Sequence, residues 1–147
     1  MRFFVAVLAF AGVHAAVVGG ALTARAIQNA PKTTWDGAYS EAQAKRGEAL
    51  YSKSCASCHG PDLSGVDAAP SLTGTEFNAG WNDLTLDDLF ERMRTTMPAD
   101  GPGSLERQQY ADILAFILSK DGFPAGQAEL PAENQTLKGI KLVAQKP

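Results

Sequence analysis

The sequence has 147 residues, of which 45% are hydrophobic, 20% are charged and 8% are aromatic. This balance is ordinary for a folded globular protein and excludes collagen-like, low-complexity and wholly disordered chains. The formal net charge is −3, so no basic excess points to a nucleic-acid-binding protein. Two cysteines are too few for the disulfide framework of a small secreted protein. We therefore expect one compact domain.

Residues 1–26 have the pattern of an export signal. One arginine precedes an apolar stretch without formal charge over residues 3–22, and Ala24-Arg25-Ala26 has the small-x-small form of a cleavage site. We predict cleavage after Ala26, since a cut after Ala15 would leave a very short leader. The alternative is an uncleaved anchor, because about 20 apolar residues can span a bilayer. A periplasmic protein is expected, bound to a membrane only if residues 3–22 are retained.

Residues 27–39 are predicted to form an extended lead-in that packs through Trp35 and Tyr39. The first helix is predicted to begin at Ser40 and to run toward the two cysteines. Ser40 and Gln43 fit a capping box, in which each side chain bonds the backbone N–H of the other residue. Small or apolar residues then recur at helical spacing: Ala44, Gly47, Leu50 and Tyr51.

Residues 60–83 are predicted to be loop, because glycine and proline interrupt them six times. A second helix is predicted to start at the N-cap Thr85, with Asp87 and Asp88 in its first turn. This helix should end before Pro98, because the residue that precedes a proline disfavours helical geometry.

The last helix is predicted to open at Ser104 and to end at Gly122. The principal domain therefore covers residues 40–122, and residues 123–147 form a C-terminal extension. Four apolar residues of this extension could fasten it to the domain surface: Leu130, Leu137, Ile140 and Leu142.

Cys55-Ala56-Ser57-Cys58-His59 is a Cys-x-x-Cys-His motif, which in an exported protein indicates covalent haem attachment. Cysteines three positions apart share one face of a helical turn, so each thiol can form a thioether with one haem vinyl group. His59 follows directly and would be the proximal ligand of the iron. The motif therefore predicts one haem c, bound through Cys55 and Cys58.

Four other interpretations use the same residues. A thioredoxin-like dithiol belongs with a βαβ pattern, and no run of strands is predicted here. A structural zinc site needs four ligands, whereas the chain after the leader offers three cysteine or histidine residues. A disulfide between Cys55 and Cys58 would close too small a loop to stabilise much. A copper carrier would use Cys55, Cys58, His59 and a methionine, and metal analysis separates it from a haem protein.

A methionine is the natural second axial ligand, because removal of the leader leaves His59 as the one histidine. Met93 falls on the apolar stripe of the second helix, where we expect it to fill the core. Met97 comes just after that helix, before Pro98, in a loop that can reach across the ring. We therefore predict that His59 and Met97 bind the iron.

The chain resembles the small monohaem class I c-type cytochromes over roughly residues 40–120. The resemblance rests on the helix before the haem motif, on Pro70-Ser71-Leu72, on Met97-Pro98 and on the last helix from Tyr110 to Leu118. It implies an all-α fold in which three principal helices and long loops surround one covalently bound haem.

The resemblance also implies two internal contacts. The first and last helices should cross where Gly47 meets an aromatic side chain, namely Phe116 or, alternatively, Tyr110. The carbonyl group of Pro70 should accept a hydrogen bond from His59, which would orient the ring and raise its basicity.

The lead-in around Trp35 and the chain beyond Phe123 look like extensions of bacterial periplasmic cytochromes that occur beside, or fused to, sulfur-compound and quinoprotein dehydrogenases. The expected function is one-electron transfer between redox proteins, from a dehydrogenase donor to an oxidase or another cytochrome. The alternative is the haem subunit of a periplasmic oxidoreductase, of the sulfur-compound dehydrogenase or peroxidase type. No catalytic residue is predicted, because the iron takes His59.

Two groups of residues near the expected haem remain open. Trp81, Arg92 and Arg94 could bond the haem propionates, or could simply belong to the core and to a solvated helix face. Five acidic residues could form a docking surface or, again, a solvated face: Asp83, Asp87, Asp88, Glu91 and Asp100.

Overall fold

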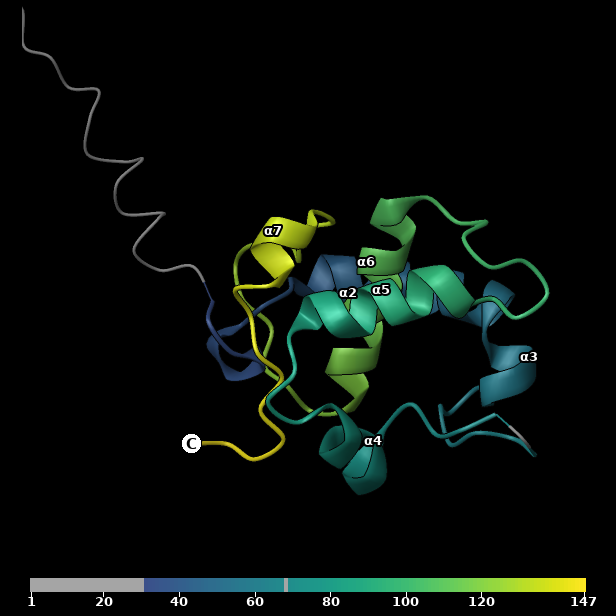
Figure 1. Ribbon diagram of the computed structural model, residues 1–147, viewed down its shortest axis with the longest axis horizontal. Coiled ribbons are helices and arrows are strands. Elements are labelled where there is room, and N and C mark those ends of the chain that lie inside the picture. The colour runs from purple at the N-terminus through teal and green to yellow at the C-terminus, as the bar shows by residue number, and fades with distance from the viewer. Residues whose placement is uncertain (1–30, 68) are drawn as a thin grey trace, which may run out of the picture. The chain divides into compact units, whose positions relative to one another are not determined.

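A computed structural model describes residues 31–67 and 69–147. The predicted leader and the first residues of the lead-in lie outside the described residues. The described part of the chain is helical, and its only β-pairing consists of isolated bridges. In chain order its elements are η1 (Thr34–Asp36), α2 (Glu41–Ser54), α3 (Ala56–His59), α4 (Gly74–Trp81), α5 (Leu86–Thr96), α6 (Arg107–Lys120) and α7 (Asn134–Leu137) (Figure 1). The all-α prediction is confirmed. No helix within these residues has the length and apolar character needed to cross a bilayer.

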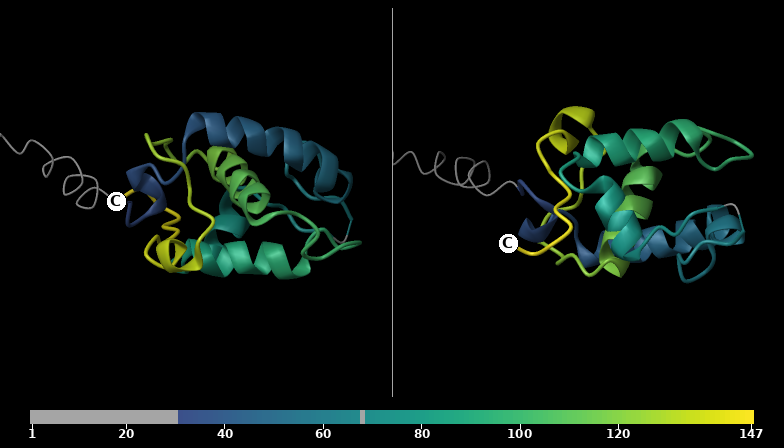
Figure 2. Two further views of the ribbon diagram at one scale, coloured as in Figure 1. Left: turned by 90° about the horizontal axis from the view of Figure 1, so that it is seen from above. Right: turned by 60° about the horizontal axis from the view of Figure 1, so that its bottom comes forward.

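Helix α6 lies at the centre of the domain. Its residues Tyr110–Leu118 are all buried, which requires neighbours on every side of the helix. Helix α2 crosses it at Gly47, where a β-carbon would lie 2.9 Å from the Phe116 β-carbon and closer still to the carbonyl group of Asp112. Figure 2 shows α2, α5 and α6 in two further views. The crossing partner is therefore Phe116, and the alternative Tyr110 is wrong.

Helix α2 begins as predicted, but only half of its capping box forms. The Ser40 hydroxyl accepts a hydrogen bond from the Gln43 backbone N–H at 3.2 Å. The Gln43 side chain turns instead to the C-terminal extension, where its amide donates to the Leu130 carbonyl at 2.9 Å and accepts from the Leu130 N–H at 2.6 Å. The capping-box prediction is wrong here because the extension offers Gln43 two backbone partners.

Helix α4 lies inside the segment that was predicted to be loop. Its N-cap Thr73 makes no side-chain capping bond. The Asp121 carboxylate, just past the end of α6, accepts from the Gly74 N–H and from the Asn78 amide, both at 2.8 Å. The prediction of continuous loop over residues 60–83 is wrong because the partner that caps α4 is distant in the sequence.

The other two long helices follow their predicted signals closely. Thr85 caps α5 and forms a capping box with Asp88, and the helix ends before Met97. Helix α6 starts at Arg107, three residues later than predicted, with Glu106 as the N-cap. It ends with Gly122 in the left-handed region, at φ +82°, which is the expected glycine termination.

The lead-in and the C-terminal extension pack against each other and against the core. Leu130, Leu137, Ile140 and Leu142 are all buried, as predicted. The Trp35 indole donates to the Val143 carbonyl and the Tyr39 hydroxyl donates to the Phe123 carbonyl, each at 2.7 Å. Both predicted anchors of the lead-in are thus confirmed, although η1 interrupts its extended course.

Candidate haem-binding site

The haem motif follows directly from the end of α2. Cys55 ends α2 and precedes α3, and its carbonyl accepts from the Cys58 N–H at 3.1 Å and from the His59 N–H at 2.9 Å. These two hydrogen bonds form one helical turn, which contains both cysteines and the histidine. Cys55 is half-buried and Cys58 is exposed, and both are free thiols.

The thiol environment differs from that of a redox-active dithiol. Burial, followed by the neighbouring Cys58, raises the pKa of the Cys55 thiol to about 11. Dithiol oxidoreductases instead lower the pKa of the attacking cysteine. The described residues also contain no group of three histidine, cysteine or acidic side chains that could hold a metal ion by themselves. Neither the dithiol nor the zinc interpretation gains support from the structure.

His59 is held in one orientation by the carbonyl of Pro70. The ring is 6% exposed, and its Nδ1 atom lies 2.9 Å from the Pro70 oxygen. A carbonyl oxygen can only accept, so Nδ1 carries the proton, and in the neutral ring Nε2 is then the nitrogen with the lone pair. This is the bond that the resemblance implied, and it leaves Nε2 available as a ligand atom.

Hydrogen bonds within the loop after His59 return the chain toward the His59 ring, so that Pro70 lies beside it. The Gly65 N–H donates to the His59 carbonyl, and the Leu72 N–H donates to the Leu63 carbonyl, each at 2.9 Å. Gly65 has φ +81°, and a β-carbon there would lie 2.8 Å from the Pro70 carbonyl carbon. From the sequence, Gly65 was only one of the glycines of the predicted loop over residues 60–83, whereas in the structure its lack of a side chain permits this close return.

A tyrosine fixes the backbone just beyond the histidine. The buried Tyr51 hydroxyl donates to the Gly60 carbonyl at 2.6 Å. Burial raises the pKa of Tyr51 to about 12, which keeps the phenol protonated and able to donate. The sequence identified Tyr51 as a core residue of the first helix, and nothing in its spacing indicated this hydrogen bond.

Met97 forms the C-cap of α5. Its N–H donates to the Met93 carbonyl at 2.9 Å, and its own carbonyl accepts from the Tyr110 hydroxyl at 2.7 Å. Met93 packs against the core, whereas Met97 is half-buried and is not among the apolar side chains that pack there. Helix α3 and the loop that follows α5 lie at the same end of the domain in every view (Figures 1 and 2).

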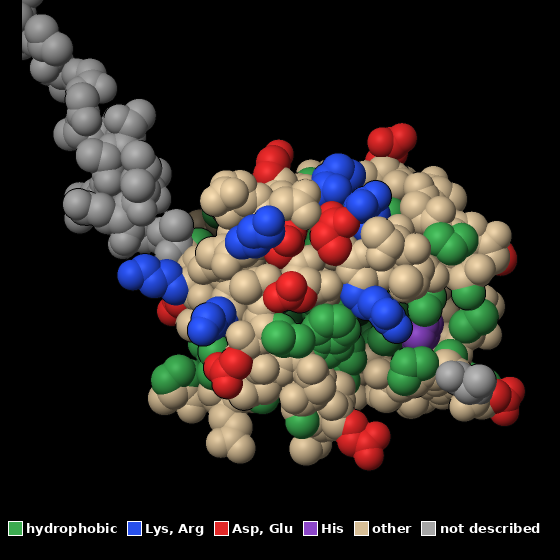
Figure 3. Space-filling view, in the orientation of Figure 1, with side chains coloured by type: hydrophobic (Ala, Val, Ile, Leu, Met, Phe, Trp, Pro, Cys, Tyr) green, Lys and Arg blue, Asp and Glu red, His purple; other side chains and the backbone are tan. Residues whose placement is uncertain are grey.

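Some apolar side chains beside the core keep part of their surface uncovered by protein. Leu72, Trp81 and Met93 pack against the core but remain only partly buried. Figure 3 shows hydrophobic side chains gathered on the face where the histidine reaches the surface. Two free thiols, an imidazole nitrogen with no hydrogen-bond partner in residues 31–67 and 69–147, and apolar surface are the groups that a covalently bound haem requires.

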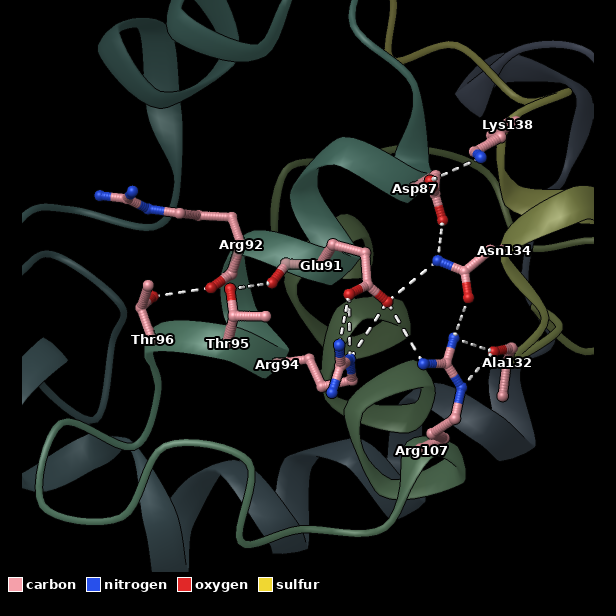
Figure 4. Close-up of polar contacts among 10 residues, drawn as sticks. All are labelled: Asp87, Glu91, Arg92, Arg94, Thr95, Thr96, Arg107, Ala132, Asn134 and Lys138. Atoms are coloured by element: carbon pink, nitrogen blue, oxygen red, sulfur yellow. Dashed lines mark hydrogen bonds and ion pairs between the residues drawn. The ribbon is translucent and has the colours of Figure 1, made fainter.

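The structure separates the two arginines that were considered for the propionates. Arg94 is committed to Glu91, with nitrogen–oxygen distances of 2.7–3.1 Å. The Arg92 guanidinium extends away from these contacts (Figure 4), and the described residues give it no hydrogen bond. Of the two arginines, Arg92 is therefore the one whose guanidinium N–H groups are not already used within the described residues and could bond a propionate.

The acidic residues do not form one open docking face. Asp87 is buried, and it accepts from the Asn134 amide at 2.6 Å. Glu91 accepts from Arg94, Arg107 and the same amide (Figure 4). Asp88 is used in the capping box of α5. Most of this charge is thus bound within the domain.

Comparisons with known proteins agree with this site. Residues 42–117 match the family described as cytochrome c oxidase, cbb3-type, subunit III. The chain is 37% identical over 84 residues to cytochrome c-551 of Bacillus subtilis (strain 168), an alignment that covers 57% of this chain and 70% of that protein. It is also 37% identical over 111 residues to the fructose dehydrogenase cytochrome subunit of Gluconobacter japonicus, which covers 66% of this chain. The chain spans 23% of the length of that subunit. No solved structure matches the chain.

Proposed function

The chain belongs to the family of c-type cytochrome domains represented by subunit III of cbb3-type cytochrome c oxidase, and on this premise we propose that it is a periplasmic one-electron carrier whose iron is held by His59 and Met97. Its cofactor is haem c, attached covalently through Cys55 and Cys58. When bound, haem c supplies an iron atom that changes oxidation state by one electron.

The observation that carries the proposal is the hydrogen bond from His59 to the Pro70 carbonyl. It fixes the tautomer, so that Nε2 can bind iron, and it raises the basicity of the ring. Met97 would supply a thioether as the second protein ligand of the iron, and His/Met ligation raises the reduction potential relative to two nitrogen ligands. Two protein ligands leave no easy position for oxygen or peroxide, which suits a carrier better than an oxidase or a peroxidase.

A haem domain that serves a dehydrogenase is the second candidate. The relative from Gluconobacter japonicus is named as the cytochrome subunit of fructose dehydrogenase, and its similarity to this chain supports that candidate. In both cases the partners are redox proteins. We propose a dehydrogenase as the donor and an oxidase or another cytochrome as the acceptor.

The periplasmic location rests on the predicted leader. We propose that export removes residues 1–26, so that the domain acts free of the membrane. N-terminal sequencing of the exported protein tests this step, and a chain that still begins at Met1 or Arg2 would contradict it.

A redox titration followed by optical absorption tests the proposed function. The exported protein should show a single one-electron transition and, in its ferric form, a far-red charge-transfer band from sulfur ligation. Met97→Ala should abolish this band and Met93→Ala should retain it. The reverse result would show that the ligand assignment is wrong. A high-spin ferric spectrum, or turnover of peroxide by the isolated protein, would show an enzyme instead of a carrier.

A further inference from the structure

The backbone of Met97 is tied to α6 by one buried tyrosine. The Tyr110 hydroxyl donates to the Met97 carbonyl at 2.7 Å, and Tyr110 is 1% exposed. The same carbonyl also accepts from the Gly103 N–H, but at 3.4 Å, near the limit of a hydrogen bond. The shorter of the two hydrogen bonds to the Met97 carbonyl is therefore made by Tyr110. This residue lies in α6 and belongs neither to α5 nor to the loop that follows α5.

The tyrosine ring is buried and packs against Phe90, which is itself in contact with Arg107. It packs edge-on against Phe90 of α5, with ring centroids 6.4 Å apart and an interplanar angle of 76°. The guanidinium of Arg107 lies over the same Phe90 ring, 4.8 Å from its centroid. Phe90 is fully buried. Burial and the contact with Phe90 restrict the ring, and so they restrict the position of the hydroxyl that holds the Met97 carbonyl.

We propose that Tyr110 is a positioning residue for the axial methionine. By fixing the Met97 carbonyl, it fixes the backbone from which the thioether reaches the iron, and so it resists loss of that ligand. This inference rests on the proposed ligation by His59 and Met97. Tyr51 does the same on the histidine side through the Gly60 carbonyl, and its ring contacts Phe116 of α6 with centroids 5.3 Å apart. Tyr51 lies in α2 and Tyr110 lies in α6, so the two helices that cross supply both hydroxyl groups.

Tyr110→Phe tests the role of the hydroxyl, because it removes one oxygen and keeps the ring. Tyr39→Phe is the matched control, since Tyr39 is also buried and also donates to a carbonyl at 2.7 Å, that of Phe123. The readout is the affinity of the ferric protein for added imidazole, which displaces methionine and removes the far-red band. Tyr110→Phe should bind imidazole about five-fold more tightly than the wild type, as expected for the loss of one hydrogen bond. Tyr39→Phe should stay within about two-fold of the wild type.

Equal imidazole affinities of Tyr110→Phe and Tyr39→Phe would overturn the inference. Met97→Ala separates this failure from a failure of the proposed ligation. If Met97→Ala leaves the far-red band in place, Met97 is not the ligand, and both proposals are wrong. If it removes the band while Tyr110→Phe behaves as the control, only the role of Tyr110 is wrong.

A second variant covers the case in which Tyr110→Phe does not fold, as judged by circular dichroism. Phe90→Leu keeps the Tyr110 hydroxyl but loosens the packing that fixes the ring. It should raise the affinity for imidazole in the same direction, and an unchanged affinity would count against the inference.

Discussion

Glu91 connects three helices through a single carboxylate. It lies in α5 and accepts from Arg94 of the same helix, from Arg107 of α6 at 3.2 Å and from Asn134 of α7 at 3.0 Å (Figure 4). These bonds, with that of Arg94 the largest, lower the pKa of Glu91 to about 2 against the opposing effect of burial. The folded protein therefore binds a proton at this site far less readily than the unfolded chain does.

We predict that Glu91→Gln lowers the free energy of unfolding by about 1.5–3 kcal/mol at pH 7, the range for hydrogen bonds to charged groups. Because the folded pKa is depressed, the contribution of Glu91 is complete above the unfolded value and is lost as the pH falls toward about 2. Urea unfolding at pH 7 and at pH 3 measures the difference. A gap between wild type and variant that does not shrink at the lower pH would contradict the account.

Glu48→Gln is the control for this experiment. Glu48 makes one loose ion pair with Lys120, at 3.9 Å, and its side chain is 60% exposed. Exposed pairs of this kind contribute less than about 1 kcal/mol, so this variant should unfold almost as the wild type does.

Asp121 presents the opposite case. Burial raises the pKa of this carboxyl, and the hydrogen bonds from Gly74 and Asn78 only partly offset that effect. One oxygen of Asp121 and the amide oxygen of Asn78 are both buried without a partner among the described residues. The carboxylate also stands at the end of α6, where a negative charge is unfavourable.

We predict that Asp121→Asn stabilises the protein by about 0.5–1.5 kcal/mol at pH 7. The new amide can accept from the Gly74 N–H and donate to the Asn78 oxygen. Because the carboxyl pKa is raised on folding, the stability of the wild type falls as the pH rises through that range, so the advantage of the variant should vanish in acid. Thermal unfolding at pH 7 and pH 3 measures this, and a less stable variant at pH 7 would show that the carboxylate is needed.

At the scale of elements, the crossing of α2 and α6 decides how closely the two central helices approach. Gly47→Ala would place a methyl group against the Asp112 carbonyl and Phe116. We predict a loss of about 1–3 kcal/mol, the usual cost of overpacking a core. Gly80→Ala in α4 is the control, because a β-carbon there meets nothing within 4 Å. It should be neutral or stabilising by up to about 1 kcal/mol. Similar unfolding midpoints for the two variants would contradict the account.

The sequence predicts those elements whose signals are local. Thr85, Asp88 and the apolar stripe of α5 lie within one segment. The structure contains the predicted cap at Thr85 and the predicted helix. Helix α4 was missed because its cap, Asp121, lies 47 positions away from Gly74. Gln43 was assigned to the wrong partner for the same reason, since Leu130 lies 87 positions away.

The candidate site also combines features that the sequence predicts with features that only the fold shows. The Cys-x-x-Cys-His motif and Met97-Pro98 can be read from the sequence, and the family resemblance supplies the bond between His59 and Pro70. The bonds that hold the site rigid cannot be read in this way. Tyr51 and Tyr110 follow helical spacing like any core residue, and only the fold shows which carbonyl each hydroxyl reaches.

At the scale of the whole molecule, the lead-in and the extension form part of one core with α2 and α6. Leu72, Trp81 and Met93 are only partly buried by protein, and we predict that the cofactor covers part of this apolar surface. A cofactor that binds the folded state stabilises it. We therefore expect haem c to stabilise the folded domain.

We predict that replacing both Cys55 and Cys58 by serine yields a poorly folded chain, with less helix and a lower melting temperature than the holoprotein. Circular dichroism during heating measures both quantities. The wild type expressed in a host without the haem ligation machinery is the control, and it should behave like the double variant. Full helicity with unchanged melting in either protein would contradict the stabilising role of the haem.

All the redox chemistry proposed for this protein requires one haem joined to the chain through Cys55 and Cys58. The most direct measurement is the mass of the denatured protein after export from a host competent in haem ligation, together with its spectrum in alkaline pyridine. We expect a mass greater than that of the polypeptide by one haem, and a reduced spectrum typical of two saturated vinyl groups. A colourless protein with the mass of the bare chain would contradict it.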